Sequence, residues 1–115
     1  VRYTAELAYS DFIREQLPDN EFFGGQVREQ LIYVPTVTRE PFPTQGRIPE
    51  LVDSGRLASV SGMPPLDPET DRAMICGSPA MLESVQAMLE RRGFSISPRI
   101  GVAGDYVIER AFVAR

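Results

Sequence analysis

The chain contains no histidine, no lysine and no tryptophan, and it has a single cysteine. Without histidine, sites that use an imidazole as general base or nucleophile partner and metal sites with a histidine ligand are excluded, and we expect no metal. One cysteine cannot close an internal disulfide, which fits a reducing compartment. No apolar run approaches the roughly 20 residues that cross a bilayer, so we expect a soluble, cytoplasmic protein without a membrane partner.

The composition is that of one globular domain. The chain has 115 residues, of which 43% are hydrophobic, enough for a modest core. Its 16 acidic residues outnumber its 12 basic ones, and the formal charge of -4 argues against broad electrostatic attraction to nucleic acid. All the basic residues are arginines, and the net charge leaves room for local arginine clusters.

The first third of the chain is expected to hold two helices and one buried strand. Apolar residues at helical spacing predict an amphipathic helix over residues 3–17, and residues 22–30 are expected to form a short second helix. Residues 31–38 are β-branched and aromatic without polar alternation, which is typical of an interior parallel strand. Pro35 cannot donate a hydrogen bond, so pairing should be one-sided or bulged there.

A long proline-rich segment follows, and after it come a strand and a helix with clear boundaries. Within residues 39–72 only 48–54 are expected to be helical, with Gly55 as the stop signal. Such long loops in compact domains are usually functional or disordered. Residues 73–76 predict a short apolar strand.

Ser78 as N-cap and Pro79 in the first turn predict a helix that runs to Arg92 and stops at Gly93. Its expected buried residues are Met81, Leu82, Val85, Met88 and Leu89.

Residues 94–97 are expected to be extended, and residues 106–113 predict a third strand. Because strand and helix alternate, the predicted class is α/β with a mainly parallel sheet.

In open α/β sheets, ligands bind beyond the carboxyl ends of the strands. The first predicted strand is followed by Thr38, Arg39 and, in the same loop, Arg47. Guanidinium groups match phosphate oxygens bidentately, and two of them can neutralise a dianion. The alternative is a pair of solvated surface arginines near Glu40 and Glu50, which spacing alone favours.

The second strand ends at Cys76, and Gly77 after it would let a ligand approach the backbone. The helix start at Ser78 and Pro79 offers N–H groups to an anionic or polar group, although an ordinary strand-to-helix turn explains the same pattern. By default Cys76 is a small buried hydrophobe, and its functional interpretation is a polarisable group beside a reacting ring. Nothing marks it as a nucleophile, because the chain has no His or Lys to lower its pKa.

Five blocks occur in order along nearly the whole chain. They are Tyr-x-Pro-Thr-Val-Thr-Arg-Glu at 33–40, Gln-Gly-Arg at 45–47, Asp-Arg-Ala-Met-Ile-Cys-Gly-Ser-Pro-x-Met-Leu at 71–82, Ser-Pro-Arg-Ile-Gly at 97–101 and Gly-Asp-Tyr-Val-Ile-Glu-Arg-Ala-Phe-Val at 104–113. Together they resemble the NADP-binding half of bacterial ferredoxin/flavodoxin NADP reductases. The resemblance implies hydride transfer between NADPH and FAD, followed by one-electron steps between the flavin and a ferredoxin or flavodoxin.

The resemblance also implies roles for single residues. Arg39 and Arg47 would clasp the 2'-phosphate and select NADP over NAD, with Thr38 beside them and Arg2 as a further contact. The other implied positions are Cys76 and Gly77 bordering the nicotinamide as the catalytic region, Ser78 and Met81 close by, and Ala111 and Phe112 against FAD.

The family's N-terminal FAD-binding β-barrel and its glycine-rich pyrophosphate turn have no counterpart in this sequence. We therefore expect residues 1–115 to be an N-terminally incomplete NADP-binding domain, from a reductase that is monomeric when full-length. The two strands that are missing would lie between residues 31–38 and residues 73–76, so a partial Rossmann-like parallel sheet with flanking helices is predicted. The alternative is a nucleotide-binding or interaction module with no redox activity of its own.

Overall fold

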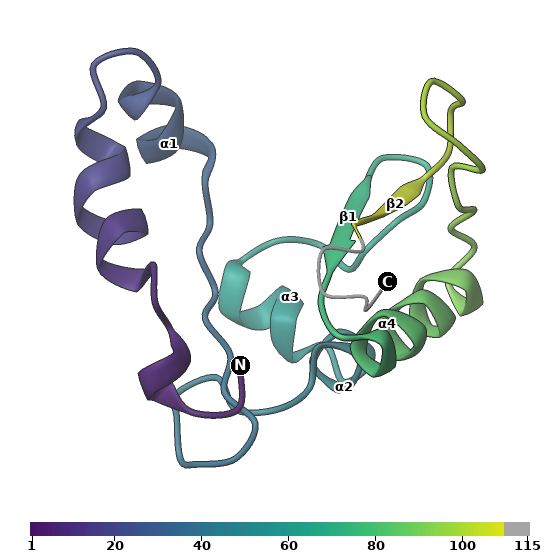
Figure 1. Cartoon of the computed structure of the whole chain (residues 1–115), viewed down its shortest axis with the longest axis horizontal. Coiled ribbons are helices and arrows are strands. Elements are labelled where there is room, and N and C mark those ends of the chain that lie inside the picture. The colour runs from purple at the N-terminus through teal and green to yellow at the C-terminus, as the bar shows by residue number, and fades with distance from the viewer. Residues whose placement is uncertain (110–115) are drawn as a thin grey trace. The chain divides into compact units, whose positions relative to one another are not determined.

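Short helices occupy the first half of the chain, and a parallel β-α-β arrangement occupies the second (Figure 1). The computed structural model describes residues 1–109, which fall into two units: Val1–Met63, and a second that begins at Pro64. The predicted α/β class with a parallel sheet and flanking helices is confirmed, although the sheet has two strands. Within the described residues, no helix combines the length and apolar character needed to span a membrane.

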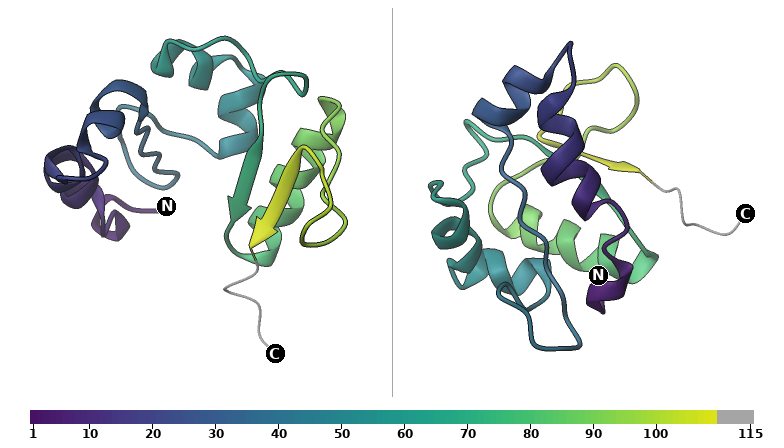
Figure 2. Two further views of the ribbon diagram at one scale, coloured as in Figure 1. Left: turned by 90° about the horizontal axis from the view of Figure 1, so that it is seen from above. Right: turned by 90° about the vertical axis from the view of Figure 1, so that its left-hand side faces the viewer.

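The second unit is built on two parallel strands and the helix that connects them. Strand β1 (Ala73–Cys76) pairs with β2 (Tyr106–Glu109), with Ala73 opposite Tyr106 and Cys76 opposite Glu109. The two strands lie side by side, with helix α4 (Pro79–Arg91) along them (Figure 2). The prediction for β1 is confirmed. The strand predicted to 113 is found as far as Glu109, and its remainder lies outside the described residues.

Local sequence signals set the ends of α4. The Ser78 hydroxyl accepts a hydrogen bond from the Met81 backbone N–H at 3.2 Å, and Pro79 occupies the first turn, as predicted. Gly93 has φ +91° just after the helix. The expected apolar face is buried at Leu82, Val85, Met88 and Leu89. Met81, which was expected in that face, is only partly buried because it lies in the first turn.

Tyr106 joins β2 to α4 in the core of this unit. Its side chain is 1% exposed, and its hydroxyl donates to Glu90 Oε1 at 2.8 Å. Burial first, and then the hydrogen bond to Glu90, raise the pKa of Tyr106, so the phenol stays protonated and remains a donor. Residues 94–97 are extended, as expected, and Ile96 forms a bridge with Tyr106.

The single amphipathic helix predicted over residues 3–17 is found only in part. A 3-10 turn, η1 (Thr4–Glu6), precedes a continuous helical stretch over residues 10–19, which contains the π-helix η2 (Phe12–Gln16) and the 3-10 turn η3 (Leu17–Asp19). None of their residues is buried, and an isolated helix that packs no apolar face is only marginally stable. The short helix predicted at 22–30 is present as α1 (Gly24–Gln30).

Residues 31–38 do not form the predicted interior strand. The segment is extended without regular pairing, and Leu31 and Ile32 are about half exposed, at 50% and 49%. Only Val37 makes a bridge, to Gln45. A strand needs a neighbour to satisfy its backbone groups, and within the described residues only the end of this segment has one: Val1 donates to the Thr36 carbonyl at 3.0 Å and accepts from the Thr38 N–H at 3.0 Å. Pro35 has no N–H to offer.

The long segment 39–72 contains two helices, where one was predicted. Helix α2 (Ile48–Asp53) matches the prediction, and α3 (Arg56–Ser61) was missed. Gly55 has φ +80° and ends α2, as expected, but it is also the residue from which α3 begins. The two helices pack against each other. Their position matters because α2 begins directly after Arg47.

Candidate functional site

The arginine loop, residues 38–47, is closed at its base by backbone hydrogen bonds. The Val37 N–H donates to the Thr44 carbonyl at 3.2 Å, and the Gly46 N–H donates to the Val37 carbonyl at 3.0 Å. Gly46 has φ +144°, and a Cβ there would lie 3.2 Å from Leu51 Cδ2. Backbone conformation and space therefore both favour glycine at this point.

This closure brings Arg39 and Arg47 to the same end of the loop base. The bridge between Val37 and Gln45 is parallel, and each arginine lies two residues beyond a bridged residue in the same chain direction. Both arginines are exposed. Within residues 1–109, neither guanidinium has a hydrogen-bond or ion-pair partner. Two unpaired cations are thus available to an anion.

The first residues of the chain lie along the start of the same loop. The Arg39 N–H donates to the Arg2 carbonyl at 2.9 Å, and the Thr38 N–H donates to the Val1 carbonyl at 3.0 Å. The structure thus brings the backbone of Arg2 next to Arg39. The Arg2 guanidinium, however, forms an ion pair with Glu6 at 3.2 Å. Arg2 must leave Glu6, or share it, before it can contact another anion.

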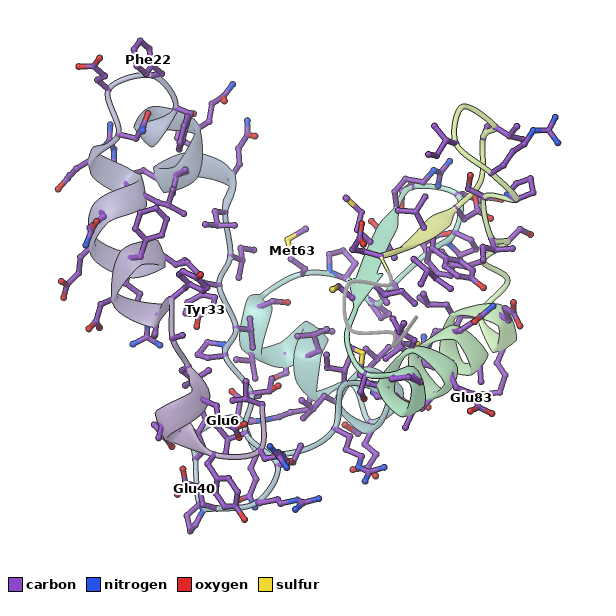
Figure 3. All side chains as sticks on the ribbon, in the orientation of Figure 1. Glu6, Phe22, Tyr33, Glu40, Met63 and Glu83 are labelled. Carbon is purple, nitrogen blue, oxygen red and sulfur yellow. The ribbon has the colours of Figure 1, made fainter. Side chains whose placement is uncertain are left out.

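Two carboxylates, Glu6 and Glu40, hold this N-terminal segment (Figure 3). Glu6 Oε1 accepts the Tyr3 N–H at 2.9 Å and the Arg2 N–H at 3.2 Å, while Glu40 Oε1 accepts the Thr4 N–H. The bond from Tyr3, and then those of Arg2, lower the pKa of Glu6. The Thr4 hydroxyl and then its N–H lower the pKa of Glu40. Glu40 therefore links the arginine loop to the start of the chain.

This link should open in acid. A lowered pKa in the folded state means that the carboxylate stabilises the contact above its ordinary pKa of 4.5, and that the contact is lost as the pH falls through the lowered value. We expect the Thr4 amide to lose hydrogen-exchange protection, and its NMR shift to move, only below pH 4.5. Glu40→Gln keeps an acceptor but does not titrate, so the transition should disappear. A Thr4 amide that is indifferent to pH in the wild type would contradict the link.

A second group of candidate residues surrounds the end of β1, in the second unit. Cys76 is exposed, so the expectation of a buried hydrophobe is wrong: side chains alternate along β1, and Cys76 follows the buried Ile75 on the same face as the exposed Met74. A Cβ on Gly77 would lie 2.5 Å from the sulfur of Met81. The Met81 side chain therefore packs directly on the Gly77 backbone, in the space that the sequence left open for a ligand.

The structure thus gathers the predicted residues in two groups, one in each unit. The first unit holds Arg2, Thr38, Arg39 and Arg47, and the second holds Cys76, Gly77, Ser78 and Met81. Ala111 and Phe112 lie outside the described residues. Sequence reasoning missed the contacts of Glu6, Glu40 and Arg56 with this region. Glu40 was visible only as a neighbour of Arg39, and no sequence signal indicated Arg56, because its helix was not predicted.

A parallel β-α-β unit and a closed loop with two unpaired arginines are features of an α/β protein suited to an anionic ligand. No family model matches the chain. It is 58% identical over all its 115 residues to a ferredoxin–NADP reductase of Pseudomonas aeruginosa, and 56% identical to one of Azotobacter vinelandii. The chain spans 45% of the length of each of these curated relatives.

A solved structure, a ferredoxin NADP+ reductase from Neisseria gonorrhoeae with bound FAD and NADP, is similar in fold. Its TM-score is 0.76 at 27% identity, over 97% of this chain and 42% of that one. The chain is therefore homologous along its whole length to part of the ferredoxin–NADP reductases. The resemblance inferred from the five sequence blocks is confirmed.

Proposed function

We propose that this chain is the NADPH-binding part of a flavoprotein oxidoreductase that passes electrons between NADPH, FAD and a ferredoxin or flavodoxin. The observation that carries the proposal is a pair of exposed arginines without side-chain partners in the described part of the chain, each two residues beyond a bridged residue at the base of the arginine loop. Two such groups suit the dianionic 2'-phosphate that distinguishes NADPH from NADH. The names of the relatives and the ligands of the Neisseria structure support the same assignment.

In the first unit, Arg39 and Arg47 bind the 2'-phosphate as charge-assisted donors. Thr38 lies at the start of the loop and offers its hydroxyl. The Arg2 guanidinium is paired with Glu6, so Arg2 contacts the phosphate only after the phosphate displaces Glu6. The closed loop base limits how far the two free arginines can separate, which lowers the entropy lost on binding.

In the second unit, the exposed end of β1 borders the nicotinamide. Cys76 contacts the ring edge as a polarisable group, and Ser78 and Met81 complete the turn around Gly77. NADPH and FAD supply the redox chemistry when bound, and this chain's residues bind and orient. Since Met81 packs on Gly77, its side chain must shift for a ring to reach that backbone. The family resemblance assigns flavin contact to Ala111 and Phe112, which are outside the described residues.

At the level of the whole protein, we propose that residues 1–115 form an NADP-binding domain that works with a FAD-binding part outside these residues. The chain spans less than half of its reductase relatives, which supports this division of labour. We also propose that the full-length enzyme is monomeric and cytoplasmic.

Titration calorimetry on the full-length protein tests the assignment directly. We expect 2',5'-ADP to bind at least tenfold more tightly than 5'-AMP, since two charge-assisted contacts to one phosphate exceed 1.4 kcal/mol together. We also expect the purified protein to be yellow, with flavin absorbance. Equal affinity for the two nucleotides would refute the phosphate site, and a colourless protein that still prefers 2',5'-ADP would point to a binding module without redox activity.

Replacing Cys76 should slow turnover without abolishing it. The thiol orients the ring and accepts no electrons itself, so Cys76→Ser is expected to lower the rate of NADPH oxidation by about tenfold or less. Rapid-mixing kinetics of flavin reduction measures this step. Met74→Ala, on the same strand and 87% exposed, is the matched control and should leave the rate unchanged. Complete loss of turnover with intact flavin binding would show that Cys76 does more than orient.

A further inference from the structure

Arg56 is tied to the arginine loop from outside it. It is the first residue of α3, and its Nη2 donates to the Pro43 carbonyl at 3.1 Å. The next carbonyl along the loop, that of Thr44, accepts the Val37 N–H, and Thr44 itself is 6% exposed. Two consecutive carbonyls of the loop are therefore held, one by the loop base and one by Arg56.

The four arginines around this loop are in different states. Arg39 and Arg47 have no side-chain partner within the described part of the chain, Arg2 pairs with Glu6, and Arg56 is bound to the loop backbone. One of the five N–H donors of Arg56 is thus engaged in holding the loop. Its position closes a ring of contacts that runs from Arg47 through α2 and α3 back to Pro43.

We propose that Arg56 is a positioning residue for the 2'-phosphate site: it fixes the arginine loop in the conformation that presents Arg39 and Arg47 to one anion. The proposal rests on the proposed function. Two arginines whose backbone positions lie at the same end of the loop base repel each other when both face one site, and a loop without its tether can relieve the repulsion by splaying. The tether opposes this before the ligand arrives, so less conformational entropy is lost on binding.

The loop sequence makes a single tether effective. Pro41 and Pro43 have fixed φ angles, so the loop has few backbone conformations to choose among. One hydrogen bond to the Pro43 carbonyl can then select one of them. An exposed hydrogen bond of this kind contributes little to global stability, and its effect should appear in the affinity of the loop for its ligand.

Arg56→Met tests the proposal, with Arg28→Met as the matched control. Arg28 also donates to a proline carbonyl, that of Pro18, so both variants remove one positive charge and one such bond, but only one of them touches the loop. In the full-length protein we expect Arg56→Met to raise the Kd of 2',5'-ADP about two- to tenfold, the range for one such hydrogen bond, with the Kd of 5'-AMP unchanged. Hydrogen exchange of residues 40–45 should become faster. Arg28→Met should change none of these.

Two further variants separate positioning from direct contact. Arg56→Lys keeps a long donor and should recover most of the affinity. In the Arg39→Ala background, Arg56→Met should cost less than it does alone, because there is one cation fewer to position. Additive losses would mean that Arg56 does not act through Arg39, and a fall of about one in the slope of log Kd against log salt would mean that Arg56 touches the phosphate; either result would overturn the proposal.

Unchanged 2',5'-ADP binding and loop exchange in Arg56→Met would also overturn the proposal. Nucleotide binding by the wild type distinguishes failure of the positioning role from failure of the proposed function. If it does not prefer 2',5'-ADP to 5'-AMP, the proposed function itself has failed; if it does and Arg56→Met behaves like Arg28→Met, only the positioning role has failed.

Discussion

Removing Arg39 and Arg47 together is expected to erase the preference of the protein for NADPH over NADH. Each single change to alanine should cost about 1.5 to 3 kcal/mol in NADPH affinity, the range for hydrogen bonds to charged groups, which is roughly a 10- to 150-fold rise in Kd. The double variant should bind NADPH and NADH about equally. NADH has no 2'-phosphate, so its affinity should change little in any of the three variants.

The double variant also reports whether the two arginines share one anion. If they do, the double loss should differ from the sum of the single losses, because the second guanidinium shifts to compensate for the first. Two arginines that pointed at separate partners would give additive losses and equal weakening of both nucleotides, which contradicts the site. Arg28→Ala is a suitable control: it removes a charge from the same unit at a residue that is bound to the Pro18 carbonyl.

The elements that the sequence predicted well are those with local signals. Helix α4 has its cap at Ser78, a proline in its first turn and Gly93 after its end, and all three act through residues within one turn. Strand residues 31–38 have equally strong β propensity, but a strand also needs a neighbour along the sheet. Within the described residues, only the end of this segment meets another part of the chain, and propensity alone did not produce a regular strand.

The same distinction applies to the candidate site. The side-chain chemistry of Arg39 and Arg47 could be read from the sequence, because guanidinium groups suit phosphate wherever the fold puts them. The contacts that hold the loop could not: Glu40 binds Thr4 across 36 positions, and Arg56 binds Pro43 from a helix that was not predicted. Both depend on chain segments meeting in space, and no short motif encodes that meeting.

A cavity at Leu89 should destabilise the second unit while leaving the phosphate site intact. Leu89 is 1% exposed on the face of α4 that is buried in the second unit, and Leu-to-Ala changes at such positions cost about 2 to 5 kcal/mol of stability. Because α4 and β1 together set the turn at Gly77, Leu89→Ala should also lower the mid-point of denaturation for the region around Cys76. Urea unfolding followed by hydrogen exchange, residue by residue, measures both effects.

Loss of stability in the second unit is not expected to change binding of 2',5'-ADP to the first unit. Arg39 and Arg47 lie in the first unit, so 2',5'-ADP should bind Leu89→Ala with wild-type affinity at temperatures where the variant is folded. Met74→Ala removes an apolar side chain from the same unit but at a position 87% exposed, and such surface changes stay within about 0.5 kcal/mol. If both variants lose the same stability, the buried face of α4 is not the core of this unit. If Leu89→Ala weakens the binding of 2',5'-ADP as much as that of NADPH, the phosphate site depends on the second unit. The assignment of the 2'-phosphate to the first unit and of the nicotinamide to the second would then be wrong.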